Sequence, residues 1–148
     1  MKKILMIAIL MLVSTMSLCS AAFQPPNPER WITIAEDEKS GCWYDKETIR
    51  FITETKSYSP CYKHKIVRSW VIMYEAEDVK SPVLKIYTDF DLTCRTTKEN
   101  HIIVCDENYK QIESVDVSYS SPKPVVPESI GEYIISVFDK EWQKYHEK

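Results

Sequence analysis

Five cysteines are the residues of this 148-residue chain most able to do chemistry. Cys42, Cys61, Cys94 and Cys105 are spread over the middle of the sequence, and Cys19 lies near its start. Zinc sites commonly use closely spaced C-x-x-C pairs, and the chain has no such pair. An even set of well-separated cysteines is typical of disulfides in an oxidising compartment. We therefore predict two disulfides and no metal site.

Four cysteines can pair in three ways, and strand geometry favours one of them. If Cys94 and Cys105 flank a hairpin whose two-residue turn is 99–100, they face each other across the strands. The Cβ atoms of such a pair approach to about 4.5–5.5 Å, within reach of a disulfide after small adjustments. Cys42 would then pair with Cys61. The other two connectivities stay open.

The histidines and carboxylates carry no catalytic signature. His64, His101 and His146 are isolated, and no HExxH, GxSxG or SxxK motif occurs. Asp89 and Asp91 should share a strand face, as in a paired-carboxylate or calcium site. The simpler explanation is the wet face of a half-buried sheet, because a small hydrolase would also need a concave pocket. We predict no catalytic residue and no cofactor.

One basic and aromatic cluster could bind a partner. It consists of Tyr62, Lys63, Lys65, Arg68 and Trp70. Cations beside aromatic rings suit an acidic protein or a glycan. The alternative is an ordinary charged strand entrance.

Composition excludes two classes of function. The chain has a net charge of −3, whereas a sequence-independent nucleic-acid binder carries a strong basic excess. Only two glycines are present, so there is no glycine-rich loop to cradle phosphates. We expect neither nucleic acid nor a nucleotide as the ligand.

The N-terminus has the pattern of an export signal. Two lysines at 2–3 precede the apolar run 4–18, which as a helix reaches only ~22 Å, short of the ~30 Å hydrocarbon core. Small residues at 20–22 predict cleavage before Phe23, which also removes the odd thiol of Cys19. The alternative is a lipid on Cys19, but the bulky leucine before it is a poor lipoprotein signal. Membrane anchoring is expected only if Cys19 is lipidated.

The chain then divides into three parts. Residues 1–22 are the signal peptide, residues 23–30 with three prolines form an extended tether, and residues 31–148 form one domain.

Alternating apolar residues predict a sheet in this domain. The β-leaning segments are 31–35, 41–44, 48–53, 65–74, 83–94, 101–105 and 112–119. The first two should form a hairpin, and the last three an antiparallel meander. Residues 83–94 have the clearest period of two, so one face should be buried and the other wet.

A helix should follow three prolines at 122–127. Residues 129–132 (Ser-Ile-Gly-Glu) match a capping box. Its expected apolar stripe is Ile130, Ile134, Val137, Phe138, Trp142 and Tyr145. Strands followed by one terminal helix predict an α+β fold, an antiparallel β-sheet of about six strands with the C-terminal α-helix packed on one face.

These features in this order resemble the bacterial surface-adhesin protein E family. They are Trp31 opening a strand, the segments 42–49 and 87–94, and the helix start 127–132. The resemblance covers residues 31–138 and implies a sheet with a helix packed on it, an exported or surface location and no catalytic residues. It also implies binding of host matrix or serum proteins, as the best-studied adhesin binds vitronectin and laminin. The terminal helix departs from the family pattern because it lacks a cysteine.

The sequence therefore predicts a non-enzymatic bacterial envelope protein, exported to the periplasm, the cell surface or the medium. The leading hypothesis is an adhesin or protein-binding module. The alternative is a periplasmic accessory or inhibitor domain that acts on another envelope protein. Both have a protein as partner, and a free edge strand would also permit a homodimer.

Overall fold

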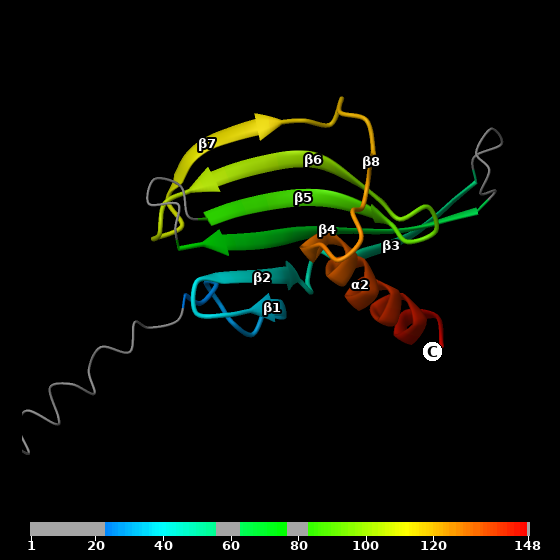
Figure 1. The fold of residues 1–148 in the computed structure, drawn as a ribbon, viewed down its shortest axis with the longest axis horizontal. Helices are drawn as coiled ribbons and strands as arrows, with labels where there is room; N and C mark the ends of the chain where they lie inside the picture. The colour runs from blue at the N-terminus through cyan, green and yellow to red at the C-terminus, as the bar shows by residue number, and fades with distance from the viewer. Residues whose placement is uncertain (1–22, 56–62, 77–82, 148) are drawn as a thin grey trace, which may run out of the picture.

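One antiparallel sheet and one helix make up the fold. The computed structural model describes residues 23–55, 63–76 and 83–147, so the signal peptide, Cys19, Tyr62 and Cys61 lie outside the described residues. The strands are β1 (Trp31–Glu36), β2 (Ser40–Asp45), β3 (Arg50–Thr55), β4 (Lys63–Glu75), β5 (Val83–Asp91), β6 (Thr96–Cys105), β7 (Gln111–Asp116) and β8 (Lys123–Pro124). The helix is α2 (Ile130–His146) (Figure 1). This arrangement confirms the α+β prediction.

The sheet is organised around β4, a 13-residue strand rich in β-branched and aromatic residues. The strand order is β1-β2-β4-β5-β6-β7, with β3 paired to β4 and β8 paired to β6. One edge of β4 is shared, because β3 pairs with its first half and β2 with its second half. The predicted β1–β2 hairpin and the β5–β6–β7 meander are both present.

The β5–β6 hairpin overturns the predicted disulfide between Cys94 and Cys105. The turn falls just after β5 and not at 99–100, since Asp91 pairs with Thr96 and Val83 with Cys105. Cys94 thus lies in the turn, and Cys105 lies at the far end of a ten-residue strand. Nine strand steps of about 3.3 Å separate residues 96 and 105, far beyond the reach of a disulfide.

The turn comes earlier in the sequence than predicted, directly after Asp91, and the side chain of Asp91 caps it. One oxygen of its carboxylate, Oδ1, accepts the backbone N–H groups of Thr93 and Cys94, both at 3.0 Å. Such a local cap competes with strand continuation. The predicted Cys42–Cys61 bond is not supported either, because Cys42 is a free, buried thiol.

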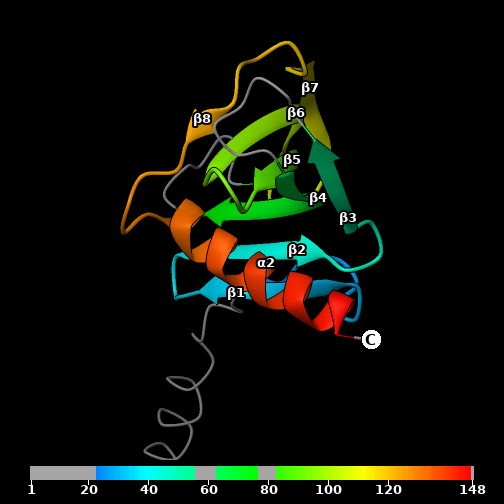
Figure 2. The ribbon, with the colours of Figure 1, turned by 90° about the vertical axis from the view of Figure 1, so that its right-hand side faces the viewer.

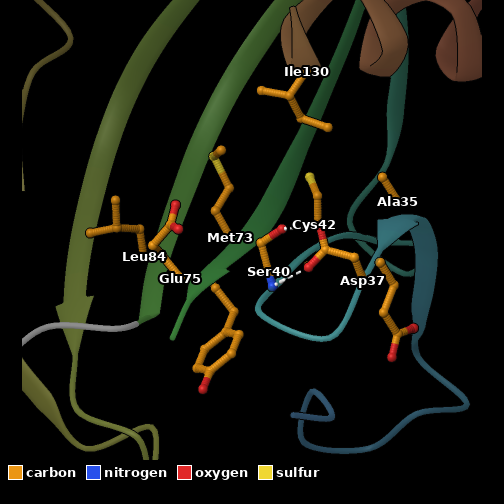
Figure 3. A pocket seen from close by; sticks show the side chains of 11 residues that line it. Ala35, Asp37, Ser40, Cys42, Met73, Glu75, Leu84 and Ile130 are labelled. Carbon is orange, nitrogen blue, oxygen red and sulfur yellow. Dashed lines mark hydrogen bonds between the residues drawn. The ribbon is translucent and has the colours of Figure 1, made fainter. Parts of the chain in front are cut away.

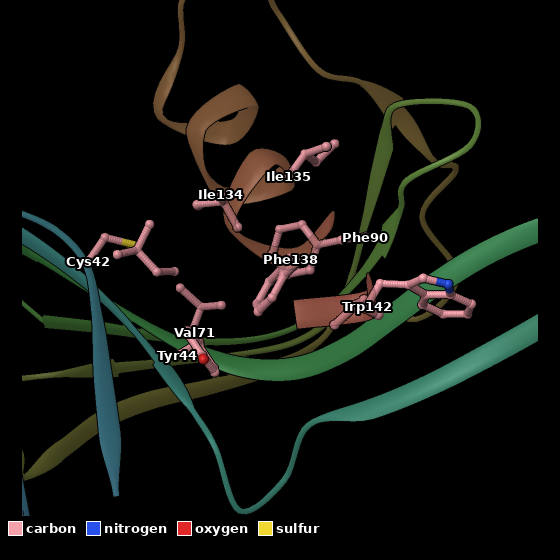
Figure 4. Packing of buried hydrophobic residues seen from close by; sticks show 10 residues of the cluster. Cys42, Tyr44, Val71, Phe90, Ile134, Ile135, Phe138 and Trp142 are labelled. Atoms are coloured by element: carbon pink, nitrogen blue, oxygen red, sulfur yellow. The ribbon is translucent and has the colours of Figure 1, made fainter. Parts of the chain in front are cut away.

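The helix α2 covers β1 and β2 and leaves β6 and β7 uncovered (Figure 2). Its buried residues are Ile134, Ile135, Phe138 and Trp142, and Figure 4 shows them packed against Tyr44, Val71 and Phe90 of the sheet. No helix within the described ranges is long and apolar enough to span a membrane.

The buried stripe of α2 differs from the predicted one at both ends. Ile130 is 42% exposed and Tyr145 is 59% exposed, whereas Ile135 is buried. Ile130 lies at the edge of a hollow, and Tyr145 stacks outside the core on Phe51, with ring centroids 4.4 Å apart. The helical period of the sequence predicted the correct side of α2 to be buried. The position of the sheet determines how α2 is rotated about its own axis.

The opposite face of the sheet has its own apolar cluster, and the predicted tether belongs to it. Trp43 and Ile72 are buried there, and Phe23 packs against them from the N-terminal segment. The Phe23 ring stacks on Tyr74 at 3.9 Å between centroids, and the Tyr109 hydroxyl donates to the Gln24 carbonyl. Residues 23–30 are therefore part of the packed domain and not a free tether.

Candidate functional site

The predicted basic cluster is divided between the two faces of β4. Side chains alternate along a strand, so Lys63 and Lys65 lie on the face of Val67, which packs in the helix-side core. Arg68 and Trp70 point to the other face. The structure thus splits the predicted binding residues into two pairs on opposite faces, Lys63 with Lys65 and Arg68 with Trp70, and Tyr62 lies outside the described residues.

The positive charge of Arg68 is neutralised by an ion pair with Asp89. Its guanidinium donates to both oxygens of Asp89, at 2.6 and 2.8 Å, and this carboxylate raises the pKa of Arg68. Trp70 lies in an aromatic row with Tyr87 and His101, at centroid distances of 5.1 and 6.0 Å. On the face of Arg68 and Trp70 the predicted site is therefore a row of rings whose arginine charge is neutralised, and the exposed Lys63 and Lys65 lie on the other face.

Asp89 and Asp91 share a strand face as predicted, and both line one hollow of about 260 Å³. Asp89 is bound to Arg68, and Asp91 contacts His64, with Nδ1 and Oδ2 2.5 Å apart. Each carboxylate has its own partner, so the two do not form a shared acidic site.

A hollow with a volume of about 570 Å³ lies on the helix side of the sheet (Figure 3). We call it the acidic hollow. It is bounded by the β1–β2 turn, the end of β4, the start of β5 and the first residue of α2. Its lining residues are Ala35, Glu36, Asp37, Ser40, Gly41, Cys42, Met73, Tyr74, Glu75, Leu84 and Ile130.

The floor of the acidic hollow is apolar. Figure 3 shows Cys42, Met73, Leu84 and Ile130 around it, each from a different element. Burial raises the pKa of the Cys42 thiol to about 12. The thiol is therefore protonated at neutral pH and behaves as a small apolar group.

The rim of the acidic hollow is negatively charged. Asp37 accepts the N–H groups of Lys39 and Ser40 at 2.8 and 2.7 Å and the Ser40 hydroxyl at 3.0 Å. These hydrogen bonds lower the pKa of Asp37, so it stays ionised. Glu36 and Glu75 are exposed, and neither forms an ion pair with a residue that the structure describes. Lys39 is the one cation in the β1–β2 turn, which leaves the rim net negative.

A smaller hollow of about 360 Å³ lies on the opposite face, between Trp31, Trp70, Arg30 and Lys85. The two cations that line it, Arg30 and Lys85, each contact another side chain of the protein. Arg30 donates to both oxygens of Asp45, at 2.9 and 2.5 Å, and the Lys85 ammonium lies 5.2 Å from the centre of a tyrosine ring. This site therefore has less unpaired charge to offer than the acidic hollow.

The sequence analysis missed the acidic hollow because four separate segments build it. The acidic run 36–38 is plain in the sequence between the predicted strands 31–35 and 41–44. Nothing in the local pattern shows that this turn lies beside Met73, Leu84 and Ile130.

Comparison of the chain with protein-family models, with curated proteins and with solved structures found no match. The resemblance to the surface-adhesin protein E family stays a prediction.

Proposed function

We propose that this protein is a non-enzymatic, exported binding module of the bacterial envelope that captures a basic segment of a partner protein in the acidic hollow. The observation that carries the proposal is the combination of an apolar floor with an acidic rim of Glu36, Asp37 and Glu75, in which hydrogen bonds lower the pKa of Asp37. Ligand sites commonly pair an apolar lining with a few placed polar groups.

The acidic hollow matches a lysine or arginine side chain. Such a side chain has an aliphatic stem that packs on apolar surface and a cationic head that stays near water. The stem would lie over Met73, Leu84 and Ile130, and the head would reach the rim carboxylates. A volume of about 570 Å³ admits a few side chains of an extended segment and not a folded domain.

The chemistry of the lining supports binding over catalysis. The Cys42 thiol has a pKa raised to about 12 by burial, which removes its nucleophilic thiolate. The pKa of Asp37 is lowered, opposite to the shift that a general acid requires. Neither group is tuned for a reaction near neutral pH.

The direct test is binding of a lysine-rich synthetic peptide to the chain purified from the bacterial envelope. We expect the double substitution Glu36→Gln and Glu75→Gln to weaken binding roughly 2- to 30-fold, because two exposed ion pairs contribute about 0.2–1 kcal/mol each. Added salt should weaken wild-type binding more than variant binding.

The matched control removes two equally exposed carboxylates elsewhere, Glu107→Gln and Glu113→Gln. It has the same change in net charge but leaves the acidic hollow intact. If both double variants lose binding equally, the attraction is a property of net charge and the proposed site is wrong.

The source of the partner separates the two forms of the proposal. An adhesin would bind surfaces coated with a host matrix or serum protein, for which vitronectin and laminin are the first probes. An accessory or inhibitor domain would instead capture one protein from a bacterial envelope extract. In either case the double variant Glu36→Gln and Glu75→Gln should capture less of the partner than the wild-type chain does. This loss would identify the acidic hollow as the contact.

A further inference from the structure

We infer that His64, Asp91 and Cys94 form a zinc-binding site where β4 begins and β5 ends. One ligand atom from each residue can be chosen so that all three lie within 4.8 Å of one another. His64 Nδ1 is 2.5 Å from Asp91 Oδ2 and 3.6 Å from Cys94 Sγ. Nitrogen, carboxylate oxygen and thiolate sulfur are the three ligand types of zinc in proteins.

The strand register and the capped turn build this site. Ile66 pairs with Asp91, and His64 lies two residues before Ile66 on the same face of β4. Asp91 uses Oδ1 to cap the turn, so Oδ2 is held towards His64. The same turn presents Cys94.

Two of the three ligands are buried and the third, Cys94, is half-buried. His64 is 3% exposed and Asp91 is 9% exposed. The capping hydrogen bonds fix the carboxylate of Asp91, as outer hydrogen bonds orient metal ligands in known sites.

The distances agree with tetrahedral coordination. Bonds of about 2.0–2.3 Å from zinc to its ligands place neighbouring ligand atoms about 3.3–3.7 Å apart. The Cys94–His64 separation of 3.6 Å already lies in this range. The shorter His64–Asp91 contact is a hydrogen bond that must open by less than 1 Å when zinc replaces its proton.

The same geometry disfavours a Cys-His-Asp catalytic triad. In a triad the carboxylate and the nucleophile use different nitrogens of the imidazole ring. Here Asp91 and Cys94 both approach Nδ1 of His64. A shared nitrogen suits coordination of one ion between the three groups.

Zinc binding at this site releases protons in a defined way. His64 coordinates through the lone pair of Nδ1, so that nitrogen carries no proton in the zinc complex, and the thiol proton passes to solvent as the zinc–sulfur bond forms. Water completes the coordination. Affinity should therefore rise with pH until the thiol proton no longer competes.

The zinc site and the acidic hollow lie at opposite ends of β4, at His64 and at Met73–Glu75 respectively. Zinc would connect β4 to the β5–β6 turn and take no part in the proposed peptide contact. The two proposals can therefore fail separately.

The test is metal binding by the full chain, purified from the envelope, reduced and freed of metal with a chelator. We expect one Zn²⁺ per chain by competition with a chromophoric chelator, and a thiolate-to-metal charge-transfer band with Co²⁺. Cys94→Ser should abolish the band and, like Asp91→Asn, weaken Zn²⁺ binding by more than about tenfold. Asparagine can still accept the two turn N–H groups, so Asp91→Asn keeps the cap.

Asp106→Asn is the matched control, because Asp106 caps the β6–β7 turn by accepting from Asn108 and Lys110 at 2.9 Å. Asp106 lies next to Cys105 in the sequence. The substitution Asp106→Asn should leave the affinity for Zn²⁺ unchanged. Absence of the Co²⁺ band, or equal affinity in all variants, would refute the site. A non-reducing peptide map that finds Cys94 bonded to Cys61 in the native protein would refute it as well, since the thiolate would be consumed.

Discussion

At the scale of single residues, Gly41 shows how a missing side chain sets the packing of β2. A Cβ at this position would lie 1.9 Å from Cη2 of the Trp43 indole, which is 2% exposed and has little room to move. We therefore expect Gly41→Ala to lower the free energy of unfolding by about 1–3 kcal/mol, measured by urea denaturation. Gly131→Ala is the matched control, since its nearest neighbours would be 3.4 Å away. This change should stabilise the helix start by about 0.4–1 kcal/mol. Equal effects of the two substitutions would contradict the argument.

At the scale of elements, α2 depends on the cap predicted by its sequence. The Ser129 hydroxyl accepts the N–H of Glu132 at 3.3 Å, and the Glu132 carboxylate accepts the N–H of Glu128, one residue before the cap. Ser129→Ala should cost about 1 kcal/mol of stability, measured by thermal unfolding monitored through circular dichroism. Ser136→Ala is the control, because the Ser136 hydroxyl only donates to the Glu132 carbonyl within the helix, and alanine is the better helix former. A loss at Ser136 as large as that at Ser129 would show that capping is not the cause.

At the scale of the whole molecule, the N-terminal segment closes the sheet face opposite α2. Phe23 packs on Tyr74, Trp43 and Tyr109, with ring centroids 3.9, 5.6 and 5.2 Å away. Phe23→Ala should cost about 1–2 kcal/mol, less than full burial would give, and should shift tryptophan emission to the red as Trp43 meets water. The control Ile112→Ala removes a side chain that is 57% exposed and should change stability by less than about 0.5 kcal/mol. An unshifted emission spectrum for Phe23→Ala would mean that the segment does not cover Trp43.

The wrong disulfide prediction has its origin in the register between strands. The period of two in residues 83–94 correctly predicted a strand, but the predicted wet face is not wet, since no residue of β5 is exposed and Asp91 is buried. This period could not show that the chain turns directly after Asp91, and this turn separates Cys94 from Cys105 and brings Cys94 to His64. The predicted basic cluster is divided for a different and local reason, because adjacent positions on a strand face opposite ways.

The sequence by itself determined the α+β class, the early hairpin, the later meander and the capped terminal helix, because these follow from local periodicity and capping chemistry. Tertiary structure alone decided which distant residues meet: Phe23 with Tyr74, the rim carboxylates with the apolar floor of the acidic hollow, and His64 with Asp91 and Cys94. Such meetings depend on strand register and on how the helix lies across the sheet. Both are set by the packing of the whole core, which no local pattern records.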